Sequence, residues 1–558
     1  MRVAIVLGAL MLAGSCIATP TTPVRPNITG LTNYYLVQQN TTLQVLDQEP
    51  PFTTLVLAKG RYNTSSHATG WDYCQIQTDE ASHDAYYYGG YLEGWLGSGS
   101  MSHTNWNITV AQNVSTWVDE HLGFMEAEAK AKEFSDPFWS QVGKLLRQME
   151  GIADGFSAKT GISLTLKEVF LQNFGNEVGD VVTALQVQAG VQVKRTVADV
   201  ANSMHCSALI KVTHDDIFVS HDTWSGFGGL GIRVYKVYKF GEVTVSMDSF
   251  PGIIASGTDW YLTSHELSIQ ETTNIVFNTS LYTAVVPKTV SEFLRVMTAN
   301  YLATTGDQWS YYFANYNSGT YNNQYMVVDY KKFDSHGTTA TLQDGLLWVA
   351  EQIPGDVEYA DQTSVLRATG YWASYNINFY QRLYNVSGYE EMYQEQGNFW
   401  SYTKYARPEI FKRNQSLVHD DASMQRMMRY NNWATDEFSI IPNCVGAEPS
   451  CATRHTSMLT IASRGDLMPV YNTTAENIFV YGPLYTFVAQ GCFGAIDSKI
   501  ATYKTHLQMR GLVINGPTND QQPTFSWGEN VVCPADQQPS GSPSTYDFPW
   551  VEFFPSFI

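Results

Sequence analysis

The sequence predicts an α+β fold, because its residue pattern changes from strands to helices and back to strands along 558 residues. Residues 30–100 have the composition of strands and turns, and residues 113–190 have helical periodicity with capping residues. After Ser203 the chain becomes a series of short β-branched and aromatic runs, with helical stretches returning later. This order predicts helices packed on sheet layers, and 44% hydrophobic residues supply a substantial core.

The first half should contain strands followed by three helices. The clearest strand runs are "TTLVLAKG" (53–60) and "YYYGGYLEGWLGS" (86–98), which are rich in apolar and aromatic residues. Helix starts are indicated by a capping residue before an apolar-periodic run, or by Asp followed by Pro. The expected helices are 115–134 with Ser115 as N-cap, 136–156 beginning with Asp-Pro, and 164–188.

The second half should consist mainly of short strands separated by turn residues. The expected strands are 206–212, 215–224, 231–240, 242–250, 252–257 and 260–277. Helices are expected again at 291–303 and 421–434.

The N-terminus has the pattern of a secretory signal peptide over residues 1–18, with one Arg, an apolar run and small residues. No later segment has the long uncharged apolar run of a transmembrane helix, so a soluble mature protein is expected. Nine Asn-X-Ser/Thr sequons agree with the secretory route and predict surface glycosylation. They are Asn27, Asn40, Asn63, Asn107, Asn113, Asn278, Asn385, Asn414 and Asn472.

The charge balance and the motifs narrow the function classes. A net charge of −20 disfavours nucleic acid and anionic membrane surfaces as main partners. The cysteines lack the spacing of zinc ligands, and no phosphate-binding loop or His-Glu-x-x-His motif occurs. We therefore expect neither a metal nor a cofactor. A homodimer is compatible with the sequence but not determined by it.

Six of the seven cysteines remain once Cys16 leaves with the signal peptide. Cys444 and Cys451 bracket a polar loop, which favours a local disulfide in an oxidising compartment. Cys492 and Cys533 could form a second disulfide. Cys74 and Cys206 would then be free, or paired with each other.

The strongest boundary in the chain lies at residues 195–206, where small and polar residues precede an apolar strand. It looks like a processing point within one fold, dividing an N-terminal fragment (19–205) from a C-terminal catalytic chain (206–558). Two interpretations of Cys206 remain open. A lone cysteine that begins an apolar strand is more often an inert core residue.

The alternative is a nucleophile exposed by cleavage between His205 and Cys206. The new α-amino group, with a pKa of about 7.7–8.0, could act as the base for the thiol of the same residue. Cys206 could also make the cut itself. Its thiol would attack the carbonyl carbon of His205, and water would release the resulting thioester.

Several unusual strings resemble the phospholipase B-like (lamina ancestor) family of N-terminal nucleophile hydrolases. They include "CSALIKV…IFVSHDTWSGF", "SFPGIIASGTDWYL", "NSGTYNNQYMVVDYK", "YWASYNI", "WSYTKYARPEIF" and "GAIDSK". The similarity covers nearly everything after the signal peptide. It implies a four-layer αββα sandwich, autocleavage before the cysteine, and a lysosomal or secreted hydrolase of glycerophospholipid acyl chains.

The resemblance also implies a set of site residues, carried over by motif. They are Cys206, His221, Trp224, Thr273, Asn376 and Arg407. Asn376 could stabilise an oxyanion, and Arg407 could hold a phosphate or orient the backbone of the nucleophile. Without the resemblance, each of these has an ordinary structural role. Asp222 replaces the Asn of some family members and could alter the pKa of His221 or the substrate preference.

Three functions remain open at this stage. The first is an acyl hydrolase acting on phospholipid esters, and the second is an amidase acting on N-acylated lipids or small peptides. The third is a glycoprotein that binds lipid without turnover, in which Cys206 is structural.

Overall fold

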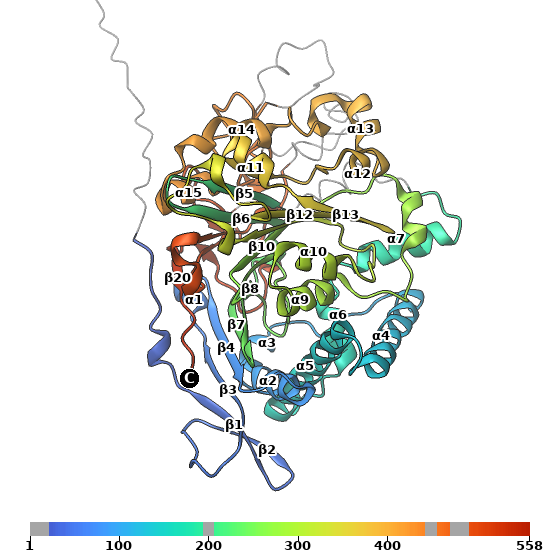
Figure 1. Ribbon diagram of the computed structural model, residues 1–558, viewed down its shortest axis with the longest axis vertical. Coiled ribbons are helices and arrows are strands. Elements are labelled where there is room, and N and C mark those ends of the chain that lie inside the picture. Colours follow the sequence, from blue (N-terminus) through green and yellow to red (C-terminus); the bar gives the residue numbers. More distant parts are fainter. Residues whose placement is uncertain (1–21, 194–205, 441–454, 469–489, 530) are drawn as a thin grey trace, which may run out of the picture.

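The protein contains two large β-sheets packed face to face, with helices against their outer faces (Figure 1). The computed structural model describes residues 22–193, 206–440, 455–468, 490–529 and 531–558. The predicted α+β class is therefore confirmed. The predicted signal peptide, His205, Asn472, and Cys444 with Cys451 lie outside the described residues.

The larger sheet has eleven strands, and only the central pair β4–β7 is parallel. Its spatial order is β13 (Asp356–Asp361), β12 (Leu347–Ile353), β11 (Asn323–Asp329), β10 (Leu267–Thr273), β9 (Trp260–Thr263), β8 (Val243–Ser249), β7 (Val234–Phe240), β4 (Asp72–Thr78), β3 (Val56–Asn63), β1 (Tyr34–Gln39) and β2 (Thr42–Leu46). Because β4 precedes residue 206 and β7 follows it, the two parts of the chain share one sheet.

The smaller sheet is antiparallel and contains Cys206. Its order is β14 (Tyr371–Ser374), β5 (Cys206–Val212), β6 (Ile217–Gly226), β16 (Asp497–Thr502), β17 (Gly511–Asn515) and β20 (Val551–Phe553), and β15 (Phe493–Ala495) extends β6. Successive side chains on a strand point to opposite faces. Ala208 and Ile210 accordingly pack with residues of the larger sheet, whereas Leu209 packs against the helices on the outer face.

Helices cover both outer faces (Figure 1). On the side of the larger sheet lie α2 (His83–Leu96), α4 (Gln112–Lys132), α5 (Pro137–Thr160), α6 (Leu166–Asn173), α7 (Val178–Gln188), α9 (Glu292–Leu302) and α10 (Gly306–Ala314). On the side of the smaller sheet lie α11 (Thr363–Thr369), α12 (Gln381–Val386), α13 (Tyr389–Gln396), α14 (Ala406–Asn414) and α15 (Asp421–Met428).

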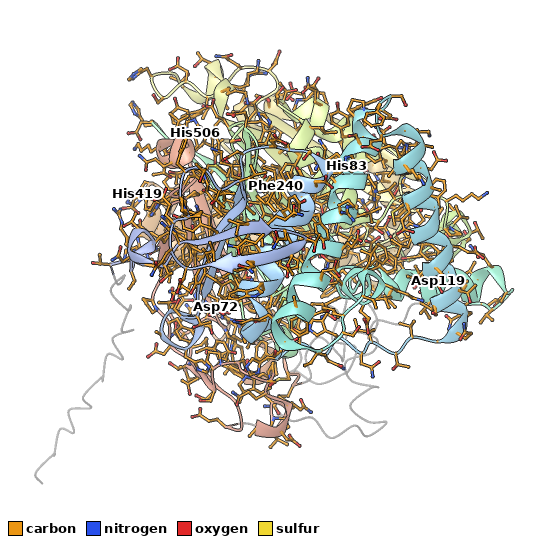
Figure 2. The ribbon with its side chains drawn as sticks, turned by 90° about the horizontal axis from the view of Figure 1, so that it is seen from below. Asp72, His83, Asp119, Phe240, His419 and His506 are labelled. Atoms are coloured by element: carbon orange, nitrogen blue, oxygen red, sulfur yellow. A yellow bond between two sulfur atoms is a disulfide. The ribbon has the colours of Figure 1, made fainter. Side chains whose placement is uncertain are left out.

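Aromatic side chains fill the space between the sheets and beneath the helices. Tyr235 of β7 stacks on Phe553 of β20 with ring centroids 4.4 Å apart, which joins the two sheets. Phe240, labelled in Figure 2, stacks on Tyr86 of α2 at 4.0 Å. Such pairs add to the stabilisation from apolar burial.

The strand expected at 86–98 is wrong, because these residues belong mainly to α2. Ser82 caps the helix by accepting a hydrogen bond from the backbone N–H of Ala85. Glycines allow α2 and α5 to lie unusually close: a Cβ at Gly90 would stand 2.0 Å from the Gln148 carbonyl oxygen, and one at Gly155 would stand 2.0 Å from that of Tyr91. The glycines serve helix packing, not turns between strands.

Four smaller expectations also need correction. The helix 115–134 starts earlier, at Gln112, so Ser115 is not its cap. The third helix is two helices, α6 and α7, and Thr165 forms a capping box at the start of α6. Residues 252–257 form a turn in place of a strand, in which Asn173 accepts a hydrogen bond from the Ile254 N–H. The run 260–277 contains two strands, β9 and β10.

Other expectations are confirmed. Asp136 caps α5 and Pro137 occupies its first turn. Strands β5, β6, β7 and β8 lie where the sequence predicts them. Cys492 and Cys533 form a disulfide, whereas Cys74 and Cys206 are free buried thiols, so the alternative that these two pair with each other is wrong.

The described surface agrees with the secretory features of the sequence. Six sequon asparagines are exposed and two, Asn63 and Asn414, are half-buried, so their glycosylation remains a prediction. None of the helices in the described ranges is both long and apolar enough to cross a bilayer.

Candidate active site

Cys206 is the first residue of β5, and its side chain is fully buried. It lies directly opposite Thr223 of β6. Burial raises the pKa of the Cys206 thiol well above its usual range, and the carboxyl groups of Glu271 and Asp259 raise it further, while Lys499 lowers it. In these surroundings the thiol is protonated at neutral pH and needs a base before it can act as a nucleophile.

Arg407 of α14 contacts three of the other site residues expected from the sequence, namely Cys206, Asn376 and Trp224. Its guanidinium donates hydrogen bonds to the carbonyl oxygen of Cys206 at 2.5 Å and to Oδ1 of Asn376 at 2.7 Å. It also donates to the Tyr375 carbonyl at 2.8 Å and lies 4.4 Å from the Trp224 ring centroid. Arg407 is fully buried among these groups. This favours a role in orienting the backbone of Cys206 over binding a substrate phosphate.

The side-chain amide of Asn376 is held at both ends. Oδ1 accepts from Arg407, and Nδ2 donates to the Thr273 carbonyl at 2.7 Å. The residue has a φ of 69°, a left-handed conformation that asparagine tolerates better than most residues. The second Nδ2 hydrogen makes no hydrogen bond within the described residues, so it remains available to an incoming oxyanion.

His221 and Asp222 lie on opposite faces of β6. His221 shares the inner face with Thr223, and burial together with the nearby Lys499 holds the pKa of its imidazole well below the usual range. Asp222 instead accepts a hydrogen bond from the Ser207 N–H at 2.8 Å. The carboxylate acting on His221 is that of Asp497, so the expected influence of Asp222 on its pKa is not supported.

A second set of buried charged residues lies next to Cys206, and the sequence reasoning missed it. Lys499 of β16 donates to Thr223 Oγ1 at 2.7 Å and pairs with Asp497 at 3.0 Å. Arg233 pairs with both Asp497 and Asp248 at 2.7 Å. The signal was present in "GAIDSK", where two charged residues occur within an apolar strand.

A pair of buried carboxyl groups approaches Cys206 from the larger sheet. The Tyr321 hydroxyl lies 2.5 Å from Asp259 Oδ2 and 3.1 Å from Glu271 Oε1. Burial raises the pKa of Asp259 and of Glu271, and their mutual repulsion raises that of Glu271 further. Two neighbouring buried carboxyl groups titrate together and retain a shared proton over a wide pH range.

Residues at the start of α7, in the N-terminal part of the chain, hold the loop that carries Tyr321 beside this acidic pair. Tyr321 has a left-handed φ of 48°, and its backbone N–H donates to Asp180 Oδ2 of α7 at 2.8 Å. Glu177, just before α7, accepts from the Glu292 N–H at 2.9 Å and from the Thr320 hydroxyl. The N-terminal part of the chain therefore positions residues of the C-terminal part.

Replacement of Glu177 by Gln is expected to reduce the pH dependence of stability. Burial raises the pKa of Glu177 from 4.5 to about 7, so the folded protein binds this proton more tightly than the unfolded chain does. The free energy of unfolding should therefore fall as pH rises from 4.5 to 7, by up to about 3 kcal/mol from this group. In Glu177→Gln the free energy of unfolding should therefore fall less between these pH values than it does in the wild type.

Urea unfolding at pH 5 and pH 7 measures the effect. The exposed Glu391 on α13 provides the control, since Glu391→Gln should leave the pH dependence as in the wild type. If the free energy of unfolding changes between pH 5 and pH 7 by the same amount in Glu177→Gln as in the wild type, the raised pKa assigned to Glu177 is contradicted.

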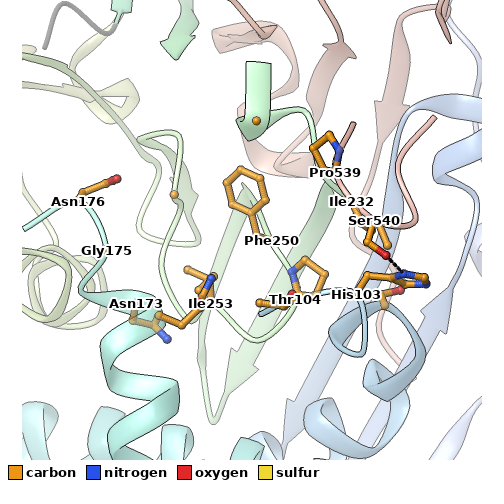
Figure 3. Close-up of a pocket in the computed structure, with 16 residues that line it drawn as sticks. His103, Thr104, Asn173, Gly175, Asn176, Ile232, Phe250, Ile253, Pro539 and Ser540 are labelled. Carbon is orange, nitrogen blue, oxygen red and sulfur yellow. Dashed lines mark hydrogen bonds between the residues drawn. The ribbon is translucent and has the colours of Figure 1, made fainter. Parts of the chain in front are cut away.

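A separate cavity of about 350 Å³ is lined by residues that precede Cys206 in the chain and by residues that follow it (Figure 3). His103 and Ser540 are hydrogen-bonded at 2.9 Å on one side, and the Phe250 ring is part of the lining. Among the described residues that line it there is no lysine or arginine, so the lining offers amides and hydroxyls in place of a cation for a phosphate group.

Known proteins resemble this chain over most of its length. The family model for phospholipase B matches residues 58–553. The chain is 32% identical over 539 residues to phospholipase B-like protein A of Dictyostelium discoideum, covering 89% of this chain and 88% of the relative. It is 32% identical over 526 residues to phospholipase B-like 1 of Homo sapiens, covering 89% and 87%. Phospholipase B of Crotalus adamanteus is 32% identical over 531 residues, covering 89% and 88%.

Proposed function

Since the chain belongs to the phospholipase B family, we propose that it removes fatty acyl chains from glycerophospholipids with Cys206 as an N-terminal nucleophile. One observation carries the proposal: a single buried side chain, Arg407, joins the Cys206 carbonyl, the Asn376 amide and the Trp224 ring. These residues are far apart in sequence. A cysteine that served only as core would need no such arrangement.

Self-cleavage comes first in the proposed mechanism. The Cys206 thiol attacks the carbonyl carbon of His205, its proton passes to the departing peptide nitrogen, and a thioester forms. Water hydrolyses the thioester, which leaves a carboxylate on His205 and a free α-amino group on Cys206. The released amine is the base that the buried thiol lacks beforehand.

The mature site then hydrolyses an ester in two steps. The α-amine accepts the thiol proton, and the thiolate attacks the acyl carbonyl carbon. Asn376 donates Nδ2–H to the oxyanion, an interaction commonly contributing about 3 kcal/mol. The glycerol oxygen leaves with the proton from the ammonium. Water, deprotonated by the same amine, then releases the fatty acid from the thioester.

The other residues position these groups. Arg407 fixes the backbone of the nucleophile through the Cys206 carbonyl, and Trp224 packs against the guanidinium. Thr273 holds the Asn376 amide through its backbone carbonyl. His221 is a neutral neighbour on the inner face of β6 and not a charged partner of the thiolate.

The proposal extends to fold type and location. The two face-to-face sheets with helices on both outer faces support a four-layer αββα sandwich of the N-terminal nucleophile type. Residues 19–205 would remain bound after cleavage, because β1, β2, β3 and β4 belong to the larger sheet. The signal-like N-terminus and the sequons support the secretory pathway, ending in the lysosome or outside the cell.

Matched substrates test the reaction. We expect fatty acid release from a 1-acyl-glycerophosphocholine at least about tenfold faster, by kcat/KM, than from an N-acylethanolamine with the same chain. A tenfold ratio corresponds to only about 1.4 kcal/mol of transition-state preference. Faster cleavage of the amide would contradict the phospholipase assignment and indicate an amidase. Binding of both lipids without turnover by the matured protein would contradict hydrolysis altogether.

A further inference from the structure

Lys499 is a buried cation whose contacts lead directly to the proposed nucleophile. Its side chain has no exposed surface, and Nζ donates to Thr223 Oγ1 at 2.7 Å and to the Thr258 carbonyl at 2.9 Å. In the sheet register Lys499 lies opposite His221, and Thr223 lies opposite Cys206. The ammonium therefore reaches across β6 to the cross-strand neighbour of the cysteine.

We propose that Lys499 is a positioning residue for Cys206: it fixes Thr223 beside the thiol and supplies the positive charge that favours the thiolate. This inference rests on the proposed role of Cys206 as nucleophile. It adds a residue outside the six that the motifs indicate.

The Thr223 hydroxyl is held from two sides. It accepts a hydrogen bond from Lys499 and donates to the Thr258 carbonyl at 3.2 Å. Directly opposed residues of an antiparallel pair have Cβ atoms about 4.5–5.5 Å apart. The Thr223 side chain is thus held in one orientation next to the thiol. Without Lys499 its hydroxyl would lose one of these partners.

The charge of Lys499 is balanced locally. Lys499 and Arg233 are the cations of the cluster, and Asp248 and Asp497 are the anions. A buried ion pair is tolerated when each charge has partners of opposite sign and further hydrogen bonds. Lys499 can therefore keep its ammonium next to Cys206 without leaving a net buried charge.

The groups around Cys206 otherwise disfavour a thiolate. In addition to burial, Glu271 of β10, Asp259 before β9 and Asp222 of β6 raise the pKa of the Cys206 thiol, and Lys499 of β16 lowers it. The guanidinium of Arg407 contacts the Cys206 carbonyl. Removal of the Lys499 charge should leave the α-ammonium of the matured Cys206 as the main cation opposing these carboxyl groups, and the thiolate should then form only at higher pH.

The test compares Lys499→Met with Lys236→Met in the matured protein. Lys236 is an equally buried lysine, paired with Glu93 at 2.6 Å on the larger sheet, so its loss controls for the removal of a buried charge. Two readouts are measured: the pH dependence of Cys206 alkylation by iodoacetamide, followed by peptide mass spectrometry, and the pH profile of kcat/KM.

Lys499→Met should shift the midpoint of alkylation upward by about one pH unit, which is about tenfold in rate on the acidic side. Lys499→Arg should restore part of the shift, and Thr223→Val should give a smaller shift in the same direction. Lys236→Met should leave the midpoint unchanged. If Lys499→Met fails to mature, the pH midpoint of Cys206 alkylation in Thr223→Val is used as the test. A midpoint equal to that of the wild type would then overturn the inference.

An unshifted midpoint in Lys499→Met, or an equal shift in Lys236→Met, would also overturn the inference. The alkylation readout does not depend on the substrate. A wild type that is inactive on phospholipid, with Lys499→Met still shifted, would therefore defeat the proposed reaction and retain the positioning role.

Discussion

Replacement of Cys206 by Ala is expected to abolish acyl hydrolysis and to leave the chain uncut. The thiol is both the attacking group in self-cleavage and the group that carries the acyl chain in turnover, so its loss removes both steps. Loss of a nucleophile commonly lowers kcat by about 10⁴-fold or more. Fatty acid release under saturating substrate, compared with the wild type, measures the effect.

Cys74 provides a matched control for this variant, since it is the other free thiol in the described chain and is equally buried. Cys74 lies on β4 in the hydrophobic core. Cys74→Ala should cost stability but keep kcat within about twofold, because it contacts no group of the proposed mechanism. Full activity in Cys206→Ala, or equal loss in both variants, would contradict the role of Cys206.

Replacement of Arg407 by Met is expected to lower kcat/KM by about 10²–10³-fold. The variant removes the hydrogen bonds to the Cys206 carbonyl, to the Tyr375 carbonyl and to the Asn376 amide, so the nucleophile and the oxyanion donor both lose their support. Removal of one oxyanion-hole donor costs a similar factor in known enzymes. Arg407→Lys should recover only part of the activity, since an ammonium cannot reproduce the planar fork.

Arg429 separates this effect from the loss of a buried arginine. It is also buried and donates to backbone carbonyls, those of Gly516 and Pro517. Arg429→Met should lower the thermal midpoint about as much as Arg407→Met does, with kcat/KM within about fivefold of the wild type in the folded protein. Equal losses of kcat/KM in both variants would assign Arg407 a purely structural role.

Most of the fold could be predicted because strands and capped helices leave local signals. The apolar strand run 206–212 and the Asp-Pro start of α5 are examples, and both are confirmed. The prediction of a strand at 86–98 was wrong because Gly90 and the other glycines of this run allow close contact with α5. Such a contact between distant segments leaves no period-2 or period-3.6 signal of its own.

The candidate site was predictable only in part, for a similar reason. The residues carried over by motif include Asn376 and Arg407, which the structure brings together with Cys206. The contacts of Lys499 and Tyr321 depend on which strands are neighbours, and a single sequence does not reveal this. The charged residues inside "GAIDSK" were a usable signal, since charges are almost never fully buried without partners.

The most direct test of the central claim is N-terminal sequencing and mass determination of every chain in the deglycosylated, matured protein. The account predicts a fragment that begins Cys206-Ser-Ala-Leu and remains associated with the N-terminal fragment, and it predicts that this fragment is absent from Cys206→Ala. A single uncut chain extending to Ile558 in an active wild-type protein would contradict an N-terminal cysteine nucleophile.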